Sequence, residues 1–138
     1  MASTNLTLLL STLITANHIL HYHGVLDAYG HISVRNPNNA STFFLARNVA
    51  PALVSSPSDI VEYLVQDASP VNLNAPPGYL ERFIHSEVLK LYPTVNSVVH
   101  SHAQSVIPFG VTEVPLVPVS QMGFPIGTKL RTTHTGIY

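Results

Sequence analysis

Hydrophobic positions near the start of the chain recur at the spacing of an amphipathic helix. They are Leu6, Leu9, Leu10, Leu13 and Leu20. Such spacing places side chains on one face of a helix. Ser3 or Thr4 could cap the first turn, and Gly24 is a residue type that commonly ends a helix in the left-handed conformation. The pattern predicts a helix over residues 4–23.

Three short segments in the first half follow the pattern of strands. Residues 31–35 alternate between polar and apolar side chains, residues 36–39 are typical of a turn, and residues 42–46 form the predicted returning strand of a hairpin. Residues 56–59 carry a helix-start or turn signal, and residues 61–65 predict a third strand. Several short strands close together indicate a sheet.

The second half contains a loop, a helix and another strand. The loop, residues 69–78, holds three prolines and one glycine. A helical pattern over residues 79–91 is ended by Pro93. The apolar run over residues 95–102 predicts a strand in the middle of the sheet, and residues 104–109 predict a short helix.

Composition limits the kinds of protein that the chain can be. It has 138 residues, 46% hydrophobic and 9% charged, with mean hydropathy +0.26 and net charge −1. This size predicts a single domain over residues 1–138, and mixed helices and strands predict a layered α/β or α+β class. No basic stripe is present, so nucleic acid is not an expected partner. The chain has no cysteine, so any bound metal must use histidine, aspartate, glutamate or water.

The apolar N-terminal segment raises the question of a targeting or membrane sequence. No lysine or arginine precedes it, which disfavours a signal peptide. Polar residues also interrupt the apolar run before it is long enough to cross a membrane. We therefore expect a cytoplasmic protein without a membrane partner.

The clearest chemical signal is the pair His100 and His102. In a strand, residues two apart point to the same face, with backbones roughly 6.5–7 Å apart. Two imidazoles in that arrangement can converge on one metal ion, and zinc is a common metal for such ligands. His21 and His23 have the same spacing but lie in the predicted helix, where residues two apart do not face each other.

Glu81 is the acidic residue most closely associated with this pair. It lies near the start of the second predicted helix, directly after the proline-rich loop. A carboxylate beside a metal could be a further ligand or a general base. The alternative is a first-turn glutamate that is stabilised by the helix dipole. We expect Asp59 and Glu87 to be surface residues.

Four motifs together resemble the class II aldolase/adducin family. They are the segments 16–20, 24–35, 81–85 and 98–102, and their order and spacing match over residues ~8–120. The resemblance implies a three-layer αβα-type α/β domain whose central, mostly antiparallel sheet is flanked by helices. It also implies a homo-oligomer, usually a tetramer, with sites at subunit interfaces.

The resemblance also implies functional residues. Enzymes of the family hold a divalent metal, usually zinc, with three histidines, two of which match His100 and His102; manganese is the other metal considered. The family's acid/base catalyst falls on Glu81. The shared chemistry is carbon–carbon bond cleavage, in which the metal acts as a Lewis acid and stabilises an enolate.

Two departures bear on the substrate. Sugar-phosphate aldolases of the family carry a serine pair where this chain has Tyr79 and Leu80, and an asparagine where it has His31. Both differences argue against a phosphorylated sugar and bring the chain closer to the branch of aromatic-acid decarboxylases. His31 or Arg47 could then contact a substrate carboxylate, although His31 could equally be a hydrogen-bonded strand residue.

A third departure concerns the last metal ligand. The family's third histidine would lie beyond Tyr138, so we interpret the chain as a C-terminally truncated member, with His134 as a possible substitute ligand. The predicted function is that of a metal-dependent lyase, of aldolase or decarboxylase type. Its substrate would be a small non-phosphorylated carbonyl compound or carboxylic acid. The alternatives are a non-catalytic, adducin-like interaction module and an inactive truncated homologue.

Overall fold

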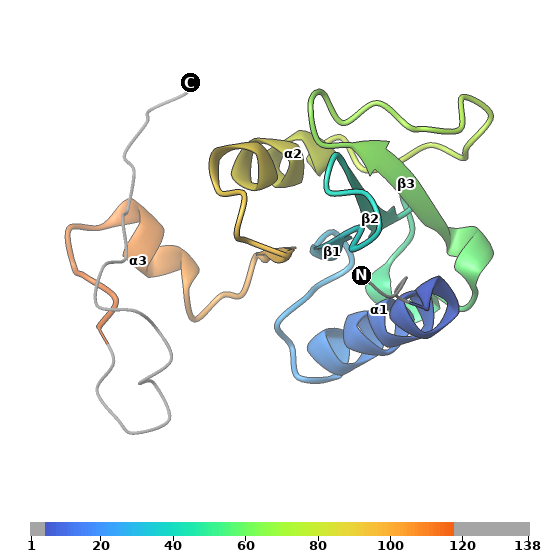
Figure 1. Ribbon diagram of the computed structural model, residues 1–138. Helices are drawn as coiled ribbons and strands as arrows, with labels where there is room; N and C mark the ends of the chain where they lie inside the picture. The colour runs from blue at the N-terminus through green and yellow to red at the C-terminus, as the bar shows by residue number, and fades with distance from the viewer. Residues whose placement is uncertain (1–4, 118–138) are drawn as a thin grey trace. The chain divides into compact units, whose positions relative to one another are not determined.

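All four strands predicted from the sequence are present in the computed structural model, which describes residues 5–117 (Figure 1). The hairpin strands β1 (His31–Arg35) and β2 (Thr42–Ala46) have the predicted bounds, and β3 (Ile60–Leu64) and β4 (Ser97–His100) follow. All of them belong to a first compact unit that ends at His102. The second unit contains the five-residue helix α3 (Ile107–Val111). The expected single domain over the whole chain stays a prediction.

The strands form one antiparallel sheet in the order β3-β2-β1-β4. The prediction that the histidine-bearing strand is central is wrong, because β4 lies at an edge of the sheet formed by the described residues. Val98 packs against the core, whereas Val99 is 45% exposed. An apolar run indicates burial on at least one face, and here only one face of the strand is well covered.

Helices α1 (Leu6–Tyr22) and α2 (Arg82–Leu91) cover opposite faces of the sheet (Figure 1). Successive residues of β1 point to these two faces in turn. Ile32 and Val34 line a small apolar cavity together with side chains of α1, whereas Ser33 contacts a side chain of α2. The expected three-layer α/β fold with a central antiparallel sheet is therefore confirmed.

Helix α1 closely matches the expected N-terminal helix. The side chain of Asn5 accepts a hydrogen bond from the amide of Leu8 at 3.3 Å, so Asn5 is the N-cap. Ser3 and Thr4 lie outside the described residues. Gly24 has a φ of +67°, the left-handed conformation expected of the residue that ends the helix. Among residues 5–117, no helix combines the length and hydrophobicity needed to span a bilayer.

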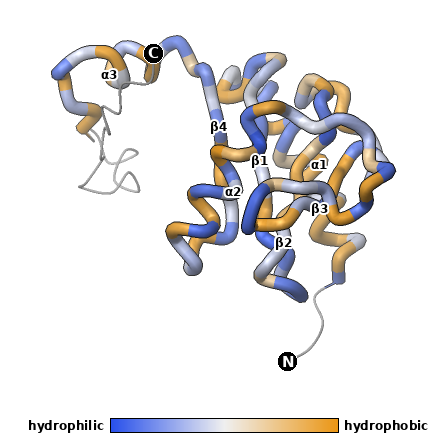
Figure 2. Tube along the Cα trace, turned by 90° about the horizontal axis from the view of Figure 1, so that it is seen from above, coloured by the Kyte–Doolittle hydropathy of each residue, from blue (hydrophilic) through white to orange (hydrophobic). Residues whose placement is uncertain are grey.

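Helix α2 begins at Arg82, later than the predicted start at residue 79. Tyr79 is buried in the core, and Glu81 occupies the N-cap position without a capping hydrogen bond from its side chain. Hydrophobic and hydrophilic positions are interleaved along α2 (Figure 2). The face that packs on the sheet contributes the buried residues His85, Ser86 and Leu89. The Glu81 carboxylate is thus available for contacts away from the helix backbone.

A buried arginine connects three parts of this unit. Arg35, at the end of β1, is only 8% exposed. Its guanidinium donates hydrogen bonds to the carbonyls of Ala40 at 2.9 Å, Leu89 at 2.7 Å, Val95 at 3.0 Å and Tyr92 at 3.4 Å. These carbonyls belong to the β1–β2 turn, to helix α2 and to the connection between α2 and β4. Arg35 therefore links the hairpin to the segment that places β4.

Gly78 allows the loop before α2 to pass closely over a buried ring. A Cβ atom at Gly78 would overlap the hydroxyl of Tyr63, which is itself buried and has no hydrogen-bond partner among the described residues. We predict that Gly78→Ala lowers the free energy of unfolding by about 1–3 kcal/mol, the usual cost of overpacking. Urea denaturation measures this value.

Two further variants identify the cause of the loss. Tyr63→Phe removes the hydroxyl, so Gly78→Ala should cost less in that background than in the unchanged chain. Gly110→Ala adds a Cβ that meets nothing within 4 Å and should cause no comparable loss. An equal loss from Gly78→Ala in both backgrounds would show that the Tyr63 hydroxyl is not the obstacle.

Candidate metal centre

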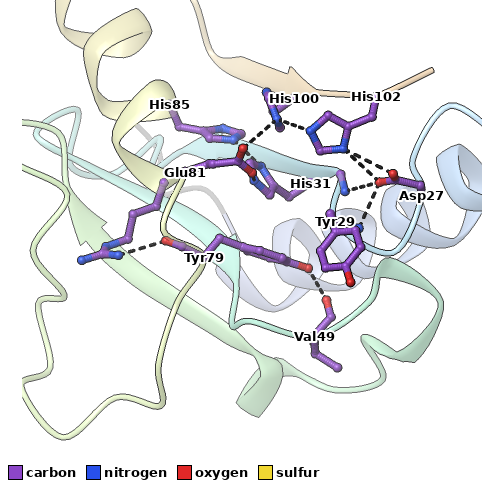
Figure 3. Close-up of polar contacts among 11 residues, drawn as sticks. Asp27, Tyr29, His31, Val49, Tyr79, Glu81, His85, His100 and His102 are labelled. Atoms are coloured by element: carbon purple, nitrogen blue, oxygen red, sulfur yellow. Dashed lines mark hydrogen bonds and ion pairs between the residues drawn. The ribbon is translucent and has the colours of Figure 1, made fainter. Parts of the chain in front are cut away.

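Two histidines and a glutamate from distant parts of the sequence meet at one end of the sheet (Figure 3). His31 begins β1, His100 ends β4, and Glu81 directly precedes α2. The antiparallel register pairs His31 with His100, so both rings lie on the same face, with centroids 4.9 Å apart. The α2 layer brings Glu81 over this pair.

The carboxylate of Glu81 lies between the two rings. Its Oε2 is 3.5 Å from His31 Nε2, and its Oε1 is 3.5 Å from His100 Nε2. One donor atom from each of the three residues lies within 4.8 Å of the others. Zinc binds nitrogen and oxygen ligands at about 2.0–2.2 Å, so a small inward movement of these side chains would bring all three to bonding distance. The donor set therefore fits a divalent metal.

His102 lies beside His100, just beyond the end of β4. Its Nε2 lies 2.9 Å from His100 Nε2, so the two rings meet as expected, although the predicted strand over 95–102 ends at His100 and His102 is not part of it. Its other ring nitrogen, Nδ1, lies 3.3 Å from both carboxylate oxygens of Asp27. A carboxylate on the second nitrogen is the usual means of orienting a metal-binding histidine. The ligand roles of His100 and His102 stay predictions.

Asp27 was not singled out from the sequence. Its Oδ1 accepts hydrogen bonds from the amides of Tyr29 at 3.0 Å and Gly30 at 2.7 Å. Although desolvation acts in the opposite direction, these bonds and the ring of His102 lower the pKa of Asp27. Asp27 therefore offers His102 a charged, fixed acceptor. An aspartate shortly before a glycine signals such a turn, but nothing local shows that the turn faces His102.

A chain of buried polar groups extends from His31 into the protein. His31 Nδ1 lies 2.6 Å from His85 Nε2, and His85 Nδ1 lies 2.7 Å from the hydroxyl of Ser33. Both rings are fully buried. Burial, followed by the charge of His100, lowers the pKa of His31 to about 4. Burial and the neighbouring His31 lower the pKa of His85 to about 3. Both imidazoles are thus neutral near pH 7.

His85 and Ser33 were also missed as parts of the site. His85 follows Glu81 by one helical turn, and Ser33 follows His31 on the same face of β1. These spacings put each residue on the correct face of its own element. The contact between the two elements depends on how α2 packs on the sheet, which the spacing does not reveal.

Tyr79 forms one wall of the site. Its ring packs against His31 with centroids 4.5 Å apart, and its hydroxyl donates a hydrogen bond to the carbonyl of Val49 (Figure 3). Burial raises the pKa of Tyr79. Leu80 is 84% exposed. These side chains stand where the resemblance indicated a phosphate-binding serine pair, and neither offers a hydroxyl directed at the cluster.

Arg47 pairs with a carboxylate of its own chain. Its Nε donates to Oδ1 of Asp59 at 2.8 Å, and none of its described side-chain hydrogen bonds is to a histidine of the cluster. The prediction that Asp59 is a surface residue is wrong, because this carboxylate is buried and accepts further bonds from Ser55 and Ser56. The Ser55 amide, followed by Arg47, lowers the pKa of Asp59. Contact of Arg47 with a substrate stays a prediction.

The remaining histidines are three near the end of α1 and His134; the first of them, His18, contacts the carbonyl of Val54 through Nε2 at 2.7 Å. His21 Nδ1 contacts the carbonyl of Leu26 at 3.1 Å, and the ring of His23 packs edge-on against Tyr22. The rings of His21 and His23 therefore have separate partners, unlike those of the pair after β4. His134, the suggested substitute ligand, lies outside the described residues.

Together these features define a layered α/β domain with a cluster of histidines and a carboxylate at the end of an antiparallel sheet. The chain belongs to the class II aldolase and adducin N-terminal domain family, whose model matches residues 11–135. The family expected from the sequence motifs is therefore confirmed.

Individual relatives refine this assignment. The chain is 56% identical over 119 residues to the decarboxylase tropJ of Talaromyces stipitatus, a match that covers 86% of this chain and 45% of the relative. The structure of L-fuculose 1-phosphate aldolase from Glaciozyma antarctica PI12 matches with a TM-score of 0.69 and 27% identity, over 80% of this chain and 46% of that one. An aldolase II superfamily protein from Pseudomonas syringae has the same TM-score at 22% identity, covering 81% and 45%.

The chain thus spans about half the length of the relatives it matches. Its identity to the relative named as a decarboxylase is about twice its identity to the fuculose-phosphate aldolase. This difference agrees with the expected position nearer to the decarboxylase branch of the family.

Proposed function

We propose that this chain carries the metal-binding and proton-transfer groups of a lyase that breaks a carbon–carbon bond and releases carbon dioxide. The substrate class is a small non-phosphorylated carbonyl compound or carboxylic acid. The observation that carries the proposal is that His100 has both partners beside it: its Nε2 lies 2.9 Å from Nε2 of His102 and 3.5 Å from Oε1 of Glu81. The 56% identity to a decarboxylase favours decarboxylation over aldol cleavage.

His100 and His102 would hold a divalent metal through their Nε2 atoms, with Asp27 orienting the second ring. Imidazole ligands suit zinc, and a carboxylate such as that of Glu81 also suits manganese. When bound, such a cation supplies Lewis acidity that stabilises negative charge developing on a substrate oxygen. The side chains of the protein carry out the remaining steps.

Glu81 is placed to move the proton. Its side chain is 44% exposed, so a substrate can reach the carboxylate, and no capping bond competes for it. When the bond to the leaving carboxylate breaks, carbon dioxide departs and the electron pair remains on the substrate carbon. That carbon must then receive a proton, which the protonated Glu81 carboxyl can deliver.

The proposal includes assembly into a homo-oligomer, as the family resemblance implies. Several large apolar side chains of the first unit are strongly exposed, as expected of surfaces that another subunit covers. They include Tyr22, Leu73, Leu80 and Leu91. Cytoplasmic location stays a prediction.

Metal analysis combined with a carbon dioxide assay tests this function. We expect about one zinc or manganese ion per chain, and carbon dioxide release from aromatic or keto acids that is lost on chelation and restored by the metal. The variant His100→Ala/His102→Ala should lose the metal, whereas His21→Ala/His23→Ala, with the same spacing of histidines, should keep it. Light scattering of the same sample reports the oligomeric state.

The opposite outcome points to a different class of protein. A folded chain that binds neither metal and releases no carbon dioxide would contradict the proposed lyase. It would favour a non-catalytic interaction module of the adducin type.

A further inference from the structure

We infer that His31 supplies a third imidazole to the metal, with Nε2 as the ligand atom, and that His85 and Ser33 fix the ring in the form that can bind. This inference rests on the proposed function, because it concerns the same metal. It assigns His31 to the metal centre, whereas the sequence suggested a contact with the substrate.

The backbone alone brings His31 to the site. His31 and His100 are direct partners in the β1–β4 pairing, so their side chains leave neighbouring strands at the same level and on the same face. Gly30 favours this close approach, since a Cβ there would lie 2.9 Å from Cδ2 of Leu26 and 3.2 Å from the His100 carbonyl. The Glu81 carboxylate lies 3.5 Å from Nε2 of each ring. All three groups face one common point.

The Nε2 atom of His31 has no hydrogen-bond partner among the described residues, although its ring is fully buried. The nearest carboxylate oxygen, 3.5 Å away, is too distant for a normal N–H···O bond. Leaving such a buried polar atom unsatisfied is unfavourable. His85 is equally buried, yet both of its ring nitrogens have partners. A cation bound at Nε2 of His31 would give this buried atom the partner that it lacks.

The direction of the buried hydrogen bonds decides between two roles for His31. If Nδ1 of His31 donates to Nε2 of His85, then Nδ1 of His85 donates to the Ser33 hydroxyl, and His31 Nε2 keeps a free lone pair. If the chain runs the other way, Nε2 carries a hydrogen and would donate to a carboxylate. The long distance to Glu81 favours the first direction, because a donor would draw an exposed carboxylate closer.

The consequence for the metal is a set of three imidazoles from His31, His100 and His102. Three protein ligands are the norm for a catalytic zinc ion. Glu81 would then remain free to transfer protons instead of serving as the third ligand. His85 would be a positioning residue, since metal-binding histidines commonly donate their other N–H to a fixed acceptor.

Nuclear magnetic resonance of the unchanged chain tests the inference directly. Long-range proton–nitrogen spectra of the protein with ¹⁵N-labelled histidine report each ring nitrogen during titration with zinc. We expect Nε2 of His31, His100 and His102 to shift together and to saturate at one zinc per chain, while His85 keeps its Nδ1 proton. Shifts at His100 and His102 without one at His31 would overturn the inference and leave the proposed function intact. Absence of zinc binding would overturn both.

Variants at His85 supply an independent measurement. We expect His85→Phe to weaken zinc affinity by about 10–100-fold, the usual effect of losing such a partner, in competition with a chromogenic chelator. His85→Gln should recover part of the affinity, because its amide oxygen can accept from His31 Nδ1. Ser86→Ala, at the neighbouring buried position on α2, is the control for general disturbance of the helix and should leave affinity unchanged. Equal affinity in all four proteins would contradict the role of His85.

Discussion

Replacing Glu81 by glutamine should reduce turnover by about 10²–10⁴-fold, the usual contribution of a general acid or base, while metal content stays near that of the unchanged chain. Glutamine has the same shape but cannot deliver a proton to the substrate carbon. The metal should remain, because the imidazoles hold it without the carboxylate. Carbon dioxide release under saturating substrate and elemental analysis of the same sample measure the two quantities.

The same helix offers a matched control for this variant. Glu87 is exposed and pairs with Lys90 at 2.6 Å, away from the cluster. Glu87→Gln should therefore leave both turnover and metal content unchanged. Turnover in Glu81→Gln equal to that of the unchanged chain would remove Glu81 from the reaction. Loss of metal in this variant would instead make the carboxylate a ligand.

The largest effect on stability is expected at Arg35. We predict that Arg35→Met lowers the free energy of unfolding by about 3–5 kcal/mol, because hydrogen bonds to charged donors contribute about 1.5–3 kcal/mol each and the cost of burying the guanidinium offsets part of their sum. Four carbonyls lose the Arg35 donor in this variant, and that of Tyr92 still accepts from the Val95 amide. Urea denaturation followed by circular dichroism measures the change.

Two comparison variants test whether the planar set of guanidinium donors in Arg35 accounts for this stability. Arg35→Lys keeps the charge but not the planar geometry, and we expect it to recover little of the loss. Arg82, which is half-buried and donates to the carbonyls of Ala68 and Tyr79, provides a comparison with fewer acceptors. Arg82→Met should cost less than Arg35→Met. A loss under 1 kcal/mol at Arg35 would refute its role as the link to β4.

Local chemistry made the elements of the fold predictable. The bounds of β1 and β2 followed from alternation and from the asparagine-rich turn between them. The start of α2 was placed too early, because Tyr79 fits the helical pattern but is held in the core by its contacts with His31 and Val49. The position of β4 in the sheet depends on strand order, and hydropathy alone does not determine strand order.

The residues of the candidate site also differ in whether local sequence could reveal them. The convergence of His100 and His102 could be foreseen from a two-residue spacing, although β4 ends at His100. Glu81 was separated from an ordinary first-turn glutamate by the family resemblance and not by its position. Asp27 and His85 could not be assigned, because each meets its histidine only after distant segments pack together. Asp59 was mistaken for a surface residue because a charge pattern does not show that Ser55 and Arg47 enclose it.

The pairing of His31 with His100 fixes more than the distance between two rings. Side chains along a strand change face at every step, so a one-residue slip of β4 against β1 would turn the His100 ring toward the apolar α1 layer. Such a change would dismantle the metal centre without replacing any of its members. The register of one pair of strands is thus as much a part of this chemistry as the histidines themselves.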